Sequence, residues 1–223
     1  MQIKGAIFDM DGTLIDSLSF WGYFWGIIGK RYLGKDNFAP DCEIDVRVRT
    51  MIYRDATRAV KDYYGIGGSV DIFLAETENL LPDFYKNFAR PKDGAIPLLT
   101  ALKAQGISLC LASATAMKEV RFVLRCHGID SYLDTVVSCA DIGVGKERPD
   151  IYLLAARRMG LSPAEIAVFE DSYVALETAR NAGFHTVGIY DRHNRVQDRL
   201  AAASEIYLGE GRPLSELIPL ITA

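Results

Sequence analysis

Cysteine, histidine and long apolar runs are scarce in this sequence, and neither sign of charge is in large excess. The 223 residues include four cysteines and three histidines, and 25 lysines and arginines stand against 29 aspartates and glutamates. A formal net charge of −4 provides no basic stripe that could neutralise a run of phosphates, so we expect no nucleic-acid partner. This charge balance still allows a local positive site for a small anion.

The cysteines do not form a disulfide or metal pattern. They lie at positions 42, 110, 126 and 139, without CxxC spacing, and their density is far below that of a disulfide scaffold. The N-terminal stretch IKGAIF is followed directly by acidic residues, unlike a signal peptide. We therefore expect a reduced, cytoplasmic protein.

One aromatic run, FWGYFWGII at residues 20–28, raises the question of a membrane contact. A membrane-spanning helix needs roughly 20 apolar residues, and Gly29, Lys30 and Arg31 end this run early. We predict a helix buried in an inserted domain and no membrane partner, with a membrane contact as the alternative.

Short apolar segments alternate with helical patterns over most of the chain. Segments of the first kind predict buried strands at 3–8, 107–112, 135–138, 166–169 and 185–189. Helical patterns cover 95–105, 117–127, 150–159 and 173–181, several of them followed by a glycine. This alternation predicts an α/β fold with a Rossmann-like, doubly wound parallel sheet.

Residues from about 18 to 90 interrupt the alternation. This region has helical periodicity and many aromatic and charged residues, but no convincing buried strand. We therefore expect an inserted α-helical domain at residues 17–90, and a catalytic core made of residues 1–16 and 91–223. Pro91 and Gly94 indicate the linker that returns to the core.

Polar residues stand where four of the predicted strands end. Asp9 and Asp11 follow the first strand, Ser113 and Ala114 the second, Lys146 the third, and Glu170 and Asp171 the fourth. In open parallel sheets ligands bind at the carboxyl ends of the strands, so these residues form one candidate site.

The predicted site has an excess of acidic groups. Four carboxylates that converge without a cation repel one another and raise their own pKa values, so a hard divalent ion is expected. Magnesium suits such oxygen ligands together with a substrate phosphate oxygen. Ser113, the amides after it and Lys146 are then expected to hold the remaining phosphate oxygens.

Four segments resemble the motifs of the haloacid dehalogenase-like superfamily of phosphohydrolases. They are DMDGT at 9–13, Ser113 after the strand LCLA, GKERPDIY at 145–152 and FEDS at 169–172. They span the core in the order and spacing of the family. The insertion after the first motif resembles the helical cap of the β-phosphoglucomutase-like and phosphoglycolate-phosphatase-like branch.

The resemblance implies a role for each residue. Asp9 is implied to attack phosphorus and to carry an aspartyl-phosphate, and Asp11 to act as general acid and then general base. The Mg²⁺ ion is implied to bind the side chains of Asp9 and Asp171 and the backbone carbonyl of Asp11, with Glu170 a direct or water-mediated ligand. Lys146 is implied to neutralise the nucleophile and the phosphate.

Further residues at and beside the motifs have supporting roles, some of them with an alternative. Gly12 provides a sharp turn that exposes amides near the phosphate, and Thr13 is expected to brace the loop. Ser113 is expected both to cap a helix and to bind phosphate. Either Asp16 or Ser17 is a candidate cap for the first inserted helix, and a functional role is the alternative for both.

Two residues of the inserted domain are candidates for substrate binding. Trp21 stands near the position where mutases of the β-phosphoglucomutase type carry a histidine, and packing within the inserted domain is the alternative role. Arg54 stands where such caps often place an arginine that faces the substrate, and a surface salt bridge is its alternative.

The function predicted from these features is a magnesium-dependent phosphatase of a small phosphorylated metabolite, such as a sugar or polyol phosphate. The alternatives are a phosphomutase, which the absent histidine disfavours, and a phosphoacceptor regulatory or metabolite-binding module. Such a module needs neither the insertion nor a second carboxylate two residues after Asp9. We expect a monomer or a weak dimer.

Overall fold

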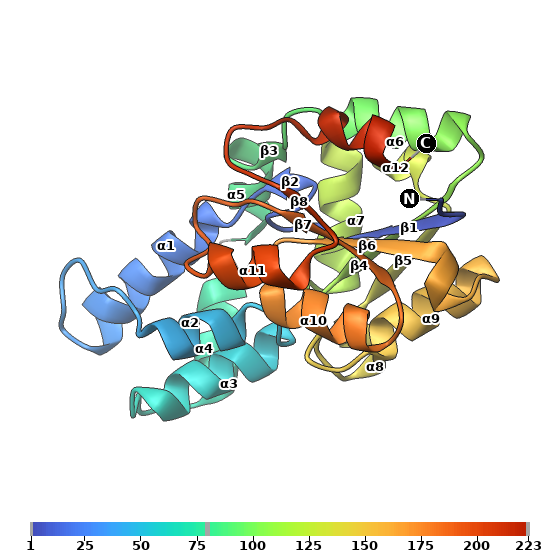
Figure 1. Cartoon of the computed structure of the whole chain (residues 1–223). Helices are drawn as coiled ribbons and strands as arrows, with labels where there is room; N and C mark the ends of the chain where they lie inside the picture. Colours follow the sequence, from blue (N-terminus) through green and yellow to red (C-terminus); the bar gives the residue numbers. More distant parts are fainter. Residues whose placement is uncertain (1, 79–80, 222–223) are drawn as a thin grey trace.

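A parallel sheet forms the centre of the protein, whose computed structural model describes residues 2–78 and 81–221 (Figure 1). Within these residues the sheet has the strand order β5-β4-β1-β6-β7-β8. The strands are β1 (Gly5–Phe8), β4 (Ser108–Ser113), β5 (Thr135–Ser138), β6 (Ile166–Glu170), β7 (His185–Ile189) and β8 (Ile206–Leu208). The chain builds the sheet from β1 through β4 to β5 at one edge and then returns to β6 on the other side of β1. The strand order therefore reverses between β1 and β6, and the predicted doubly wound fold is confirmed.

Helices cover both faces of the sheet. The first face carries α6 (Ala95–Ala104), α7 (Met117–Cys126) and α12 (Ile218–Ile221), and the second α9 (Asp150–Met159), α10 (Tyr173–Asn181) and α11 (Gln197–Ala203). Figure 1 shows α6 and α12 above the sheet and α9, α10 and α11 below it. Shorter elements are α8 (Cys139–Ile142) and the 3₁₀ helices η2 (Asp130–Tyr132), η3 (Pro163–Glu165) and η4 (Leu214–Leu217).

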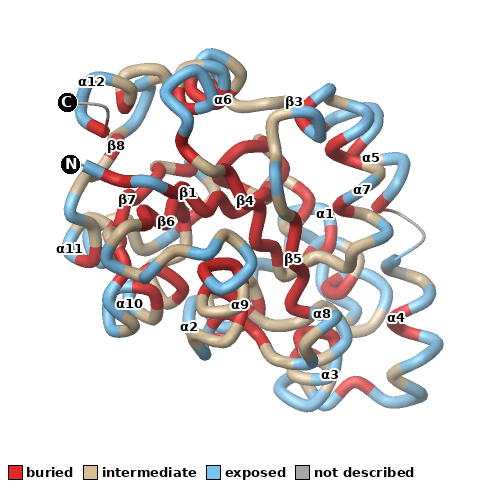
Figure 2. Tube along the Cα trace, turned by 90° about the vertical axis from the view of Figure 1, so that its right-hand side faces the viewer, coloured by how far each residue is buried: buried red, intermediate tan, exposed pale blue. Residues whose placement is uncertain are grey.

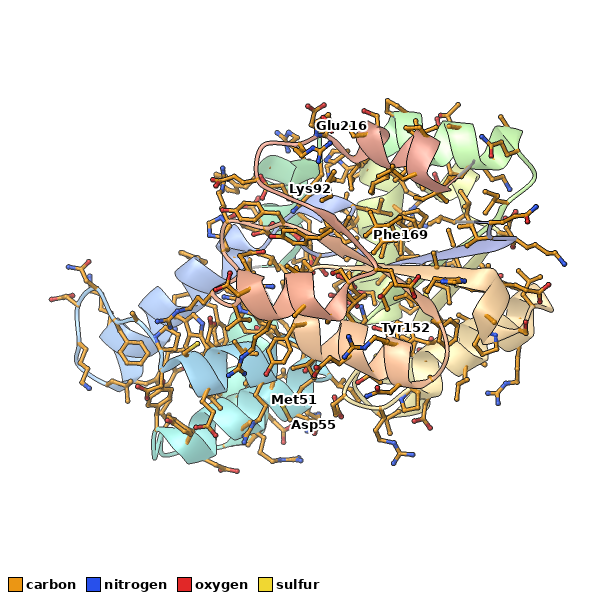
Figure 3. The ribbon with its side chains drawn as sticks, viewed as in Figure 1. Met51, Asp55, Lys92, Tyr152, Phe169 and Glu216 are labelled. Atoms are coloured by element: carbon orange, nitrogen blue, oxygen red, sulfur yellow. The ribbon has the colours of Figure 1, made fainter. Side chains whose placement is uncertain are left out.

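The strands are mostly apolar because both of their faces are covered. Successive side chains point to opposite faces, so Ile7 and Phe8 belong to different hydrophobic clusters. The ring of Phe8 stacks on Phe169 with centroids 4.2 Å apart, and Tyr152 packs on the other face (Figure 3). Figure 2 shows the buried residues concentrated along the central strands.

The insertion leaves and rejoins the core through a short two-stranded ribbon. Strand β2 (Ile15–Asp16) pairs antiparallel with β3 (Arg90–Pro91). Between them lie α1 (Ser19–Ile27), the π-helical turn η1 (Ile28–Tyr32), α2 (Cys42–Val48), α3 (Tyr53–Tyr63), α4 (Val70–Glu78) and α5 (Leu81–Asn87). We retain residues 17–90 as the proposed extent of this helical cap.

The aromatic run at residues 20–28 packs inside the cap. Phe20, Phe24 and Trp25 of α1 are buried, whereas Tyr23 is 54% exposed. The prediction that Asp16 or Ser17 caps this helix is wrong, because Leu18 occupies the N-cap position and no side chain caps it. In the described ranges 2–78 and 81–221 no helix is long and apolar enough to cross a membrane.

Candidate active site

The loop after β1 lies at the point where the strand order reverses. Asp9 is buried there, and its backbone N–H donates to the carbonyl of Phe169 at the end of the neighbouring strand β6. Gly12 follows with a φ of +85°, and a Cβ at this position would lie 2.7 Å from Cγ of Asp171. Only glycine fits this turn, because the turn needs both a left-handed backbone and a close approach to the carboxylate.

Three carboxylates and one ammonium group form the centre of the site. Oxygen atoms of Asp9, Glu170 and Asp171 all lie within 4.8 Å of one another, and all three residues are buried. The ammonium group of Lys146, itself only 3% exposed, donates to both Asp9 and Glu170. The phenol of Tyr152 donates to Glu170 at 3.0 Å. The strand ends therefore converge as the sequence indicates.

The acidic groups are not fully compensated by this one lysine. Burial raises the pKa of Asp9 well above its usual value, and the charges of Glu170, Asp171 and Asp11 raise it further, against the opposite effect of Lys146. Burial and the charge of Glu170 raise the pKa of Asp171 to about 8. Burial lowers the pKa of Lys146, but the charges of Asp9 and Glu170 outweigh it and raise that pKa overall. This buried excess of carboxylate oxygens suits the coordination of a divalent cation such as Mg²⁺.

Asp11 lies outside this group of three, and hydroxyl groups surround its carboxylate. Its Oδ1 accepts hydrogen bonds from Ser17 at 2.7 Å and from Tyr85 at 2.9 Å, and its Oδ2 accepts one from Thr115 at 2.8 Å. Tyr85 comes from α5 of the cap and Thr115 from the loop after β4. Both elements thereby fix the orientation of Asp11.

The end of β4 provides the expected hydroxyl and backbone amides. Ser113 and Ala114 line the same cavity as Asp9 and Lys146. The Oγ of Ser113 accepts the N–H of Thr115 at 3.0 Å. The prediction that Ser113 also caps a helix is wrong, because α7 begins only at Met117, with Ala116 in the N-cap position.

The cap closes the other side of this cavity, which has a volume of about 110 Å³. Trp21 contributes to its wall and also packs on Phe24 and Trp25, so substrate binding by Trp21 stays a prediction beside its packing role. Arg54 does not line it: this side chain is 54% exposed and pairs with Asp71 at 2.9 Å, which is the alternative role given above. The cap arginine in the cavity wall is Arg49, which the sequence interpretation missed.

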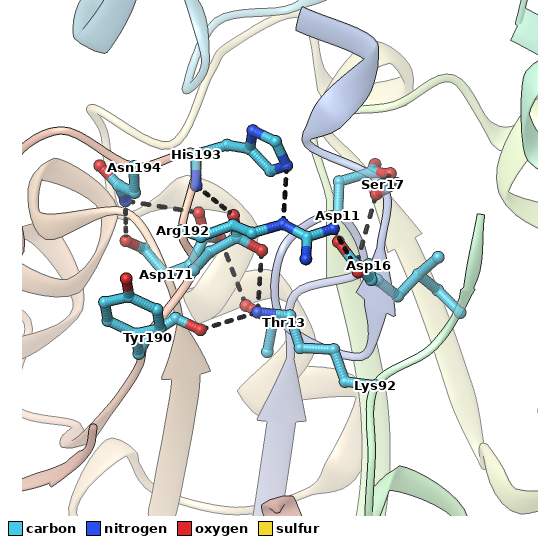
Figure 4. Close-up of polar contacts among 12 residues, drawn as sticks. Asp11, Thr13, Asp16, Ser17, Lys92, Asp171, Tyr190, Arg192, His193 and Asn194 are labelled. Carbon is cyan, nitrogen blue, oxygen red and sulfur yellow. Dashed lines mark hydrogen bonds and ion pairs between the residues drawn. The ribbon is translucent and has the colours of Figure 1, made fainter. Parts of the chain in front are cut away.

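The loop after β7 provides a further residue that the sequence interpretation missed. Asn194 is buried, and its side-chain amide donates to the backbone carbonyl of Asp171 (Figure 4). The same amide lies 3.5 Å from Oδ2 of Asp171, whose Oδ1 accepts from the hydroxyl of Thr13 at 3.3 Å. Thr13 therefore braces Asp171 from one side and Asn194 from the other.

Neighbours of Asn194 connect the same loop to the hinge and the cap. Arg192 pairs with Asp16 of the hinge ribbon at 3.3 Å, and Arg195 donates to the carbonyl of Pro40 in the cap at 2.9 Å. This loop follows the carboxyl end of β7, where ligands bind in open parallel sheets, so its place beside the site was predictable from the sequence.

The fold and the site together define a family. A model of the haloacid dehalogenase-like hydrolase family matches residues 3–183. The chain therefore belongs to this family and is an enzyme, a hydrolase.

Named relatives cover most of the chain. It is 26% identical over 185 residues to a phosphorylated carbohydrates phosphatase of Thermotoga maritima, covering 83% of this chain and 84% of that protein. It is 30% identical over 212 residues to (DL)-glycerol-3-phosphatase 2 of Arabidopsis thaliana, with 89% and 86% covered. A solved structure of a predicted phosphoglycolate phosphatase from Haemophilus somnus superposes with a TM-score of 0.81 at 19% identity, covering 99% and 98%, which supports the fold alone.

Proposed function

We propose that this hydrolase is a magnesium-dependent phosphatase of small phosphorylated metabolites, and that the reaction passes through an aspartyl-phosphate on Asp9. The observation that carries the proposal is the buried group of Asp9, Glu170, Asp171 and Lys146, which opens into a cavity closed by the cap. Names of relatives that act on phosphorylated carbohydrates and glycerol phosphate support this substrate class.

Asp9 is the nucleophile in this proposal. A carboxylate oxygen of Asp9 forms a bond to phosphorus while the bond from phosphorus to the leaving-group oxygen breaks. Asp11 gives its proton to that oxygen, and the leaving group departs as an alcohol. A water molecule then attacks phosphorus, Asp11 takes the proton of that water, and Asp9 is restored with release of phosphate.

The residues near Asp11 hold its carboxylate in one orientation. The hydroxyls of Ser17, Tyr85 and Thr115 all donate to it, and Asp11 lines the same cavity as Asp9. Lys146 donates a hydrogen bond to Asp9, and its positive charge would stabilise the phosphoryl oxygens. Ser113 and Ala114 line the same cavity, and the hydroxyl of Ser113 with the backbone amide of Ala114 would bind the remaining oxygens.

Magnesium would be held by Asp9 and Asp171, with Glu170 as a direct or water-mediated ligand and the backbone carbonyl of Asp11 as a further one. When bound, the ion supplies positive charge that stabilises the phosphoryl group during transfer. Asn194 and Thr13 hold Asp171 in position for this role.

Removing Asn194 should weaken the metal site. For Asn194→Ala we expect the magnesium concentration needed for half-maximal activity to rise about 10- to 100-fold, the usual effect of losing a residue that orients a metal ligand. Magnesium titration of the initial rate measures this, with Asn87→Ala, an exposed asparagine of α5, as the matched control. An unchanged titration curve would show that Asn194 does not support Asp171.

The direct test of the proposed function is phosphate release from sugar phosphates, glycerol 3-phosphate, phosphoglycolate and p-nitrophenyl phosphate. Release should fall at least about tenfold when EDTA removes magnesium, because the uncompensated carboxylates then repel the phosphoryl group. A parallel assay follows the interconversion of hexose 1- and 6-phosphates. Interconversion without net release would make the protein a mutase, and inactivity in both assays would favour a regulatory or binding role.

Two further parts of the proposal concern assembly and location. We propose a monomer or weak dimer, which light scattering after gel filtration measures. We also propose that the enzyme works in the cytoplasm, where its free cysteines Cys42, Cys110, Cys126 and Cys139 stay reduced.

A further inference from the structure

Arg49 of the cap is held by a buried carboxylate. Its Nε and Nη2 donate to the carboxylate of Asp45 one helical turn earlier, at distances of 3.0 to 3.2 Å. Asp45 is 2% exposed and also accepts the indole N–H of Trp25 at 2.8 Å. The guanidinium carbon of Arg49 lies 5.4 Å from the centre of a ring of Trp21. The contacts with Trp25 and Trp21 therefore hold the ion pair of Asp45 and Arg49 in place.

One nitrogen of this arginine has no hydrogen-bond partner. Nη1 of Arg49 is buried, and no acceptor reaches it within residues 2–78 and 81–221. Arg49 and Trp21 both line the cavity that contains Asp9, whereas Asp45 is not among the lining residues and lies behind the arginine. A buried donor without a partner is unfavourable. Because Arg49 lines the cavity, an oxygen atom of a substrate that reaches this side chain would satisfy the donor.

The charges around the cavity indicate which kind of oxygen it is. Asp45 cancels the charge of Arg49, and the described residues of the cap and α7 add two carboxylates to the lining, Glu78 and Glu119. Lys118 lies 3.9 Å from Glu119 but is 90% exposed, so it acts mainly from the solvent side. Away from the phosphoryl site, the wall therefore carries a hydrogen-bond donor and no net positive charge.

Most of the remaining wall is apolar. It includes Leu18, Phe20, Val48, Met51 and Ala56. A second phosphate or a carboxylate on the substrate would lose water here without gaining a counter-ion. A hydroxyl or ether oxygen can accept the Nη1 hydrogen bond without that penalty.

We propose that the cavity selects phosphate monoesters whose leaving group is an uncharged polyol, and that Asp45 sets this preference by neutralising Arg49. The inference rests on the proposed phosphatase activity and adds its specificity. Asp45 is a positioning residue, since it acts on the substrate through Arg49.

Two substrate pairs test the inference, because each pair differs mainly by one carboxylate. The pairs are glycerol 3-phosphate with 3-phosphoglycerate, and glucose 6-phosphate with 6-phosphogluconate. The native enzyme should have the higher kcat/KM for the uncharged member of a pair. The variant Asp45→Asn keeps the shape of the side chain but removes its charge. In this variant the ratio of the two kcat/KM values should shift toward the carboxylate member by roughly tenfold or more, as expected when the partly buried charge of Arg49 is no longer compensated.

Matched variants separate this effect from damage to the cap. Asp55→Asn makes the same change of net charge on α3, outside the cavity lining, and should leave the ratio unchanged. The double variant Asp45→Asn/Arg49→Met should lose the gain, because the freed cation is gone. A gain that survives the loss of Arg49 would contradict the role given to the pair.

The results of these assays separate a failure of the proposed specificity from a failure of the proposed phosphatase activity. No phosphate release from any monoester, p-nitrophenyl phosphate included, would contradict the proposed phosphatase. Release that favours the carboxylate members in the native enzyme, or an Asp45→Asn ratio equal to that of Asp55→Asn, would overturn the inference alone. Turnover of p-nitrophenyl phosphate without either uncharged member would overturn it as well.

Discussion

The Asp9→Asn enzyme should release phosphate at least about 10⁴-fold more slowly than the native enzyme, because loss of a covalent nucleophile removes both displacement steps. An amide oxygen is a poor nucleophile, and the phosphoryl group then has no acceptor in the site. The measurement is kcat with the best substrate and saturating magnesium. Acid-quenched samples should contain no phosphorylated protein.

The loss of activity in this variant should not reflect unfolding. Asp9 is one of three crowded carboxylates, and burial together with its acidic neighbours opposes its charge. Without metal, replacing it by a neutral residue should leave the melting temperature equal or higher. Near-native turnover by Asp9→Asn would contradict the proposed mechanism.

The Asp11→Asn enzyme should lose about 10²- to 10⁴-fold in kcat with alkyl phosphates, the range expected for a general acid and base. An alkyl alcohol leaves poorly without a proton, so formation of the phosphoenzyme should be slow. The p-nitrophenolate group leaves without one, so p-nitrophenyl phosphate should still transfer its phosphoryl group. Hydrolysis of the phosphoenzyme also lacks its base, and a burst of p-nitrophenol followed by slow turnover is expected.

A carboxylate of the neighbouring hinge ribbon gives the control for Asp11. Asp16→Asn makes the same charge change but removes only the contact with Arg192 at the surface. It should keep the leaving-group dependence of the native enzyme. Equal losses for alkyl and p-nitrophenyl substrates in Asp11→Asn, without a burst, would exclude the acid and base role.

The sheet and its strand ends were predictable because local patterns encode them. The predicted strands at 135–138 and 185–189 and the helices at 150–159 and 173–181 have the same limits in the structure. Polar residues directly after such strands must meet at one edge of a parallel sheet. This rule sufficed to bring Asp9, Lys146, Glu170 and Asp171 together.

The residues that were missed depend on contacts that no local pattern encodes. Asn194 reaches Asp171 across 23 positions of sequence, from a loop with no marked motif. The cap arginines at 47, 49, 54 and 58 all lie in or beside helical segments, and only the packing of α2 and α3 decides which one faces the cavity. One local signal was available: Asp45 stands four residues before Arg49, which is the spacing of a helical ion pair.

Local chemistry also misled the assignment of helix caps. Ser17 and Ser113 have the residue type of a cap, but Ser17 donates to Asp11, and Ser113 accepts from the N–H of Thr115. At an active site a hydroxyl can be held by the site rather than by the helix that follows. Such competition becomes visible only when the strand ends are placed together.

The measurement that tests the central claim most directly is the location of the phosphoryl group in the acid-quenched Asp11→Asn enzyme after reaction with p-nitrophenyl phosphate and magnesium. Peptide mass spectrometry should find one phosphoryl group on the peptide that contains Asp9, and fragmentation should place it on that residue. It should be absent from Asp9→Asn/Asp11→Asn treated in the same way. A phosphoryl group on another residue, or native turnover with no phosphoenzyme in any variant, would contradict an aspartyl-phosphate mechanism at Asp9.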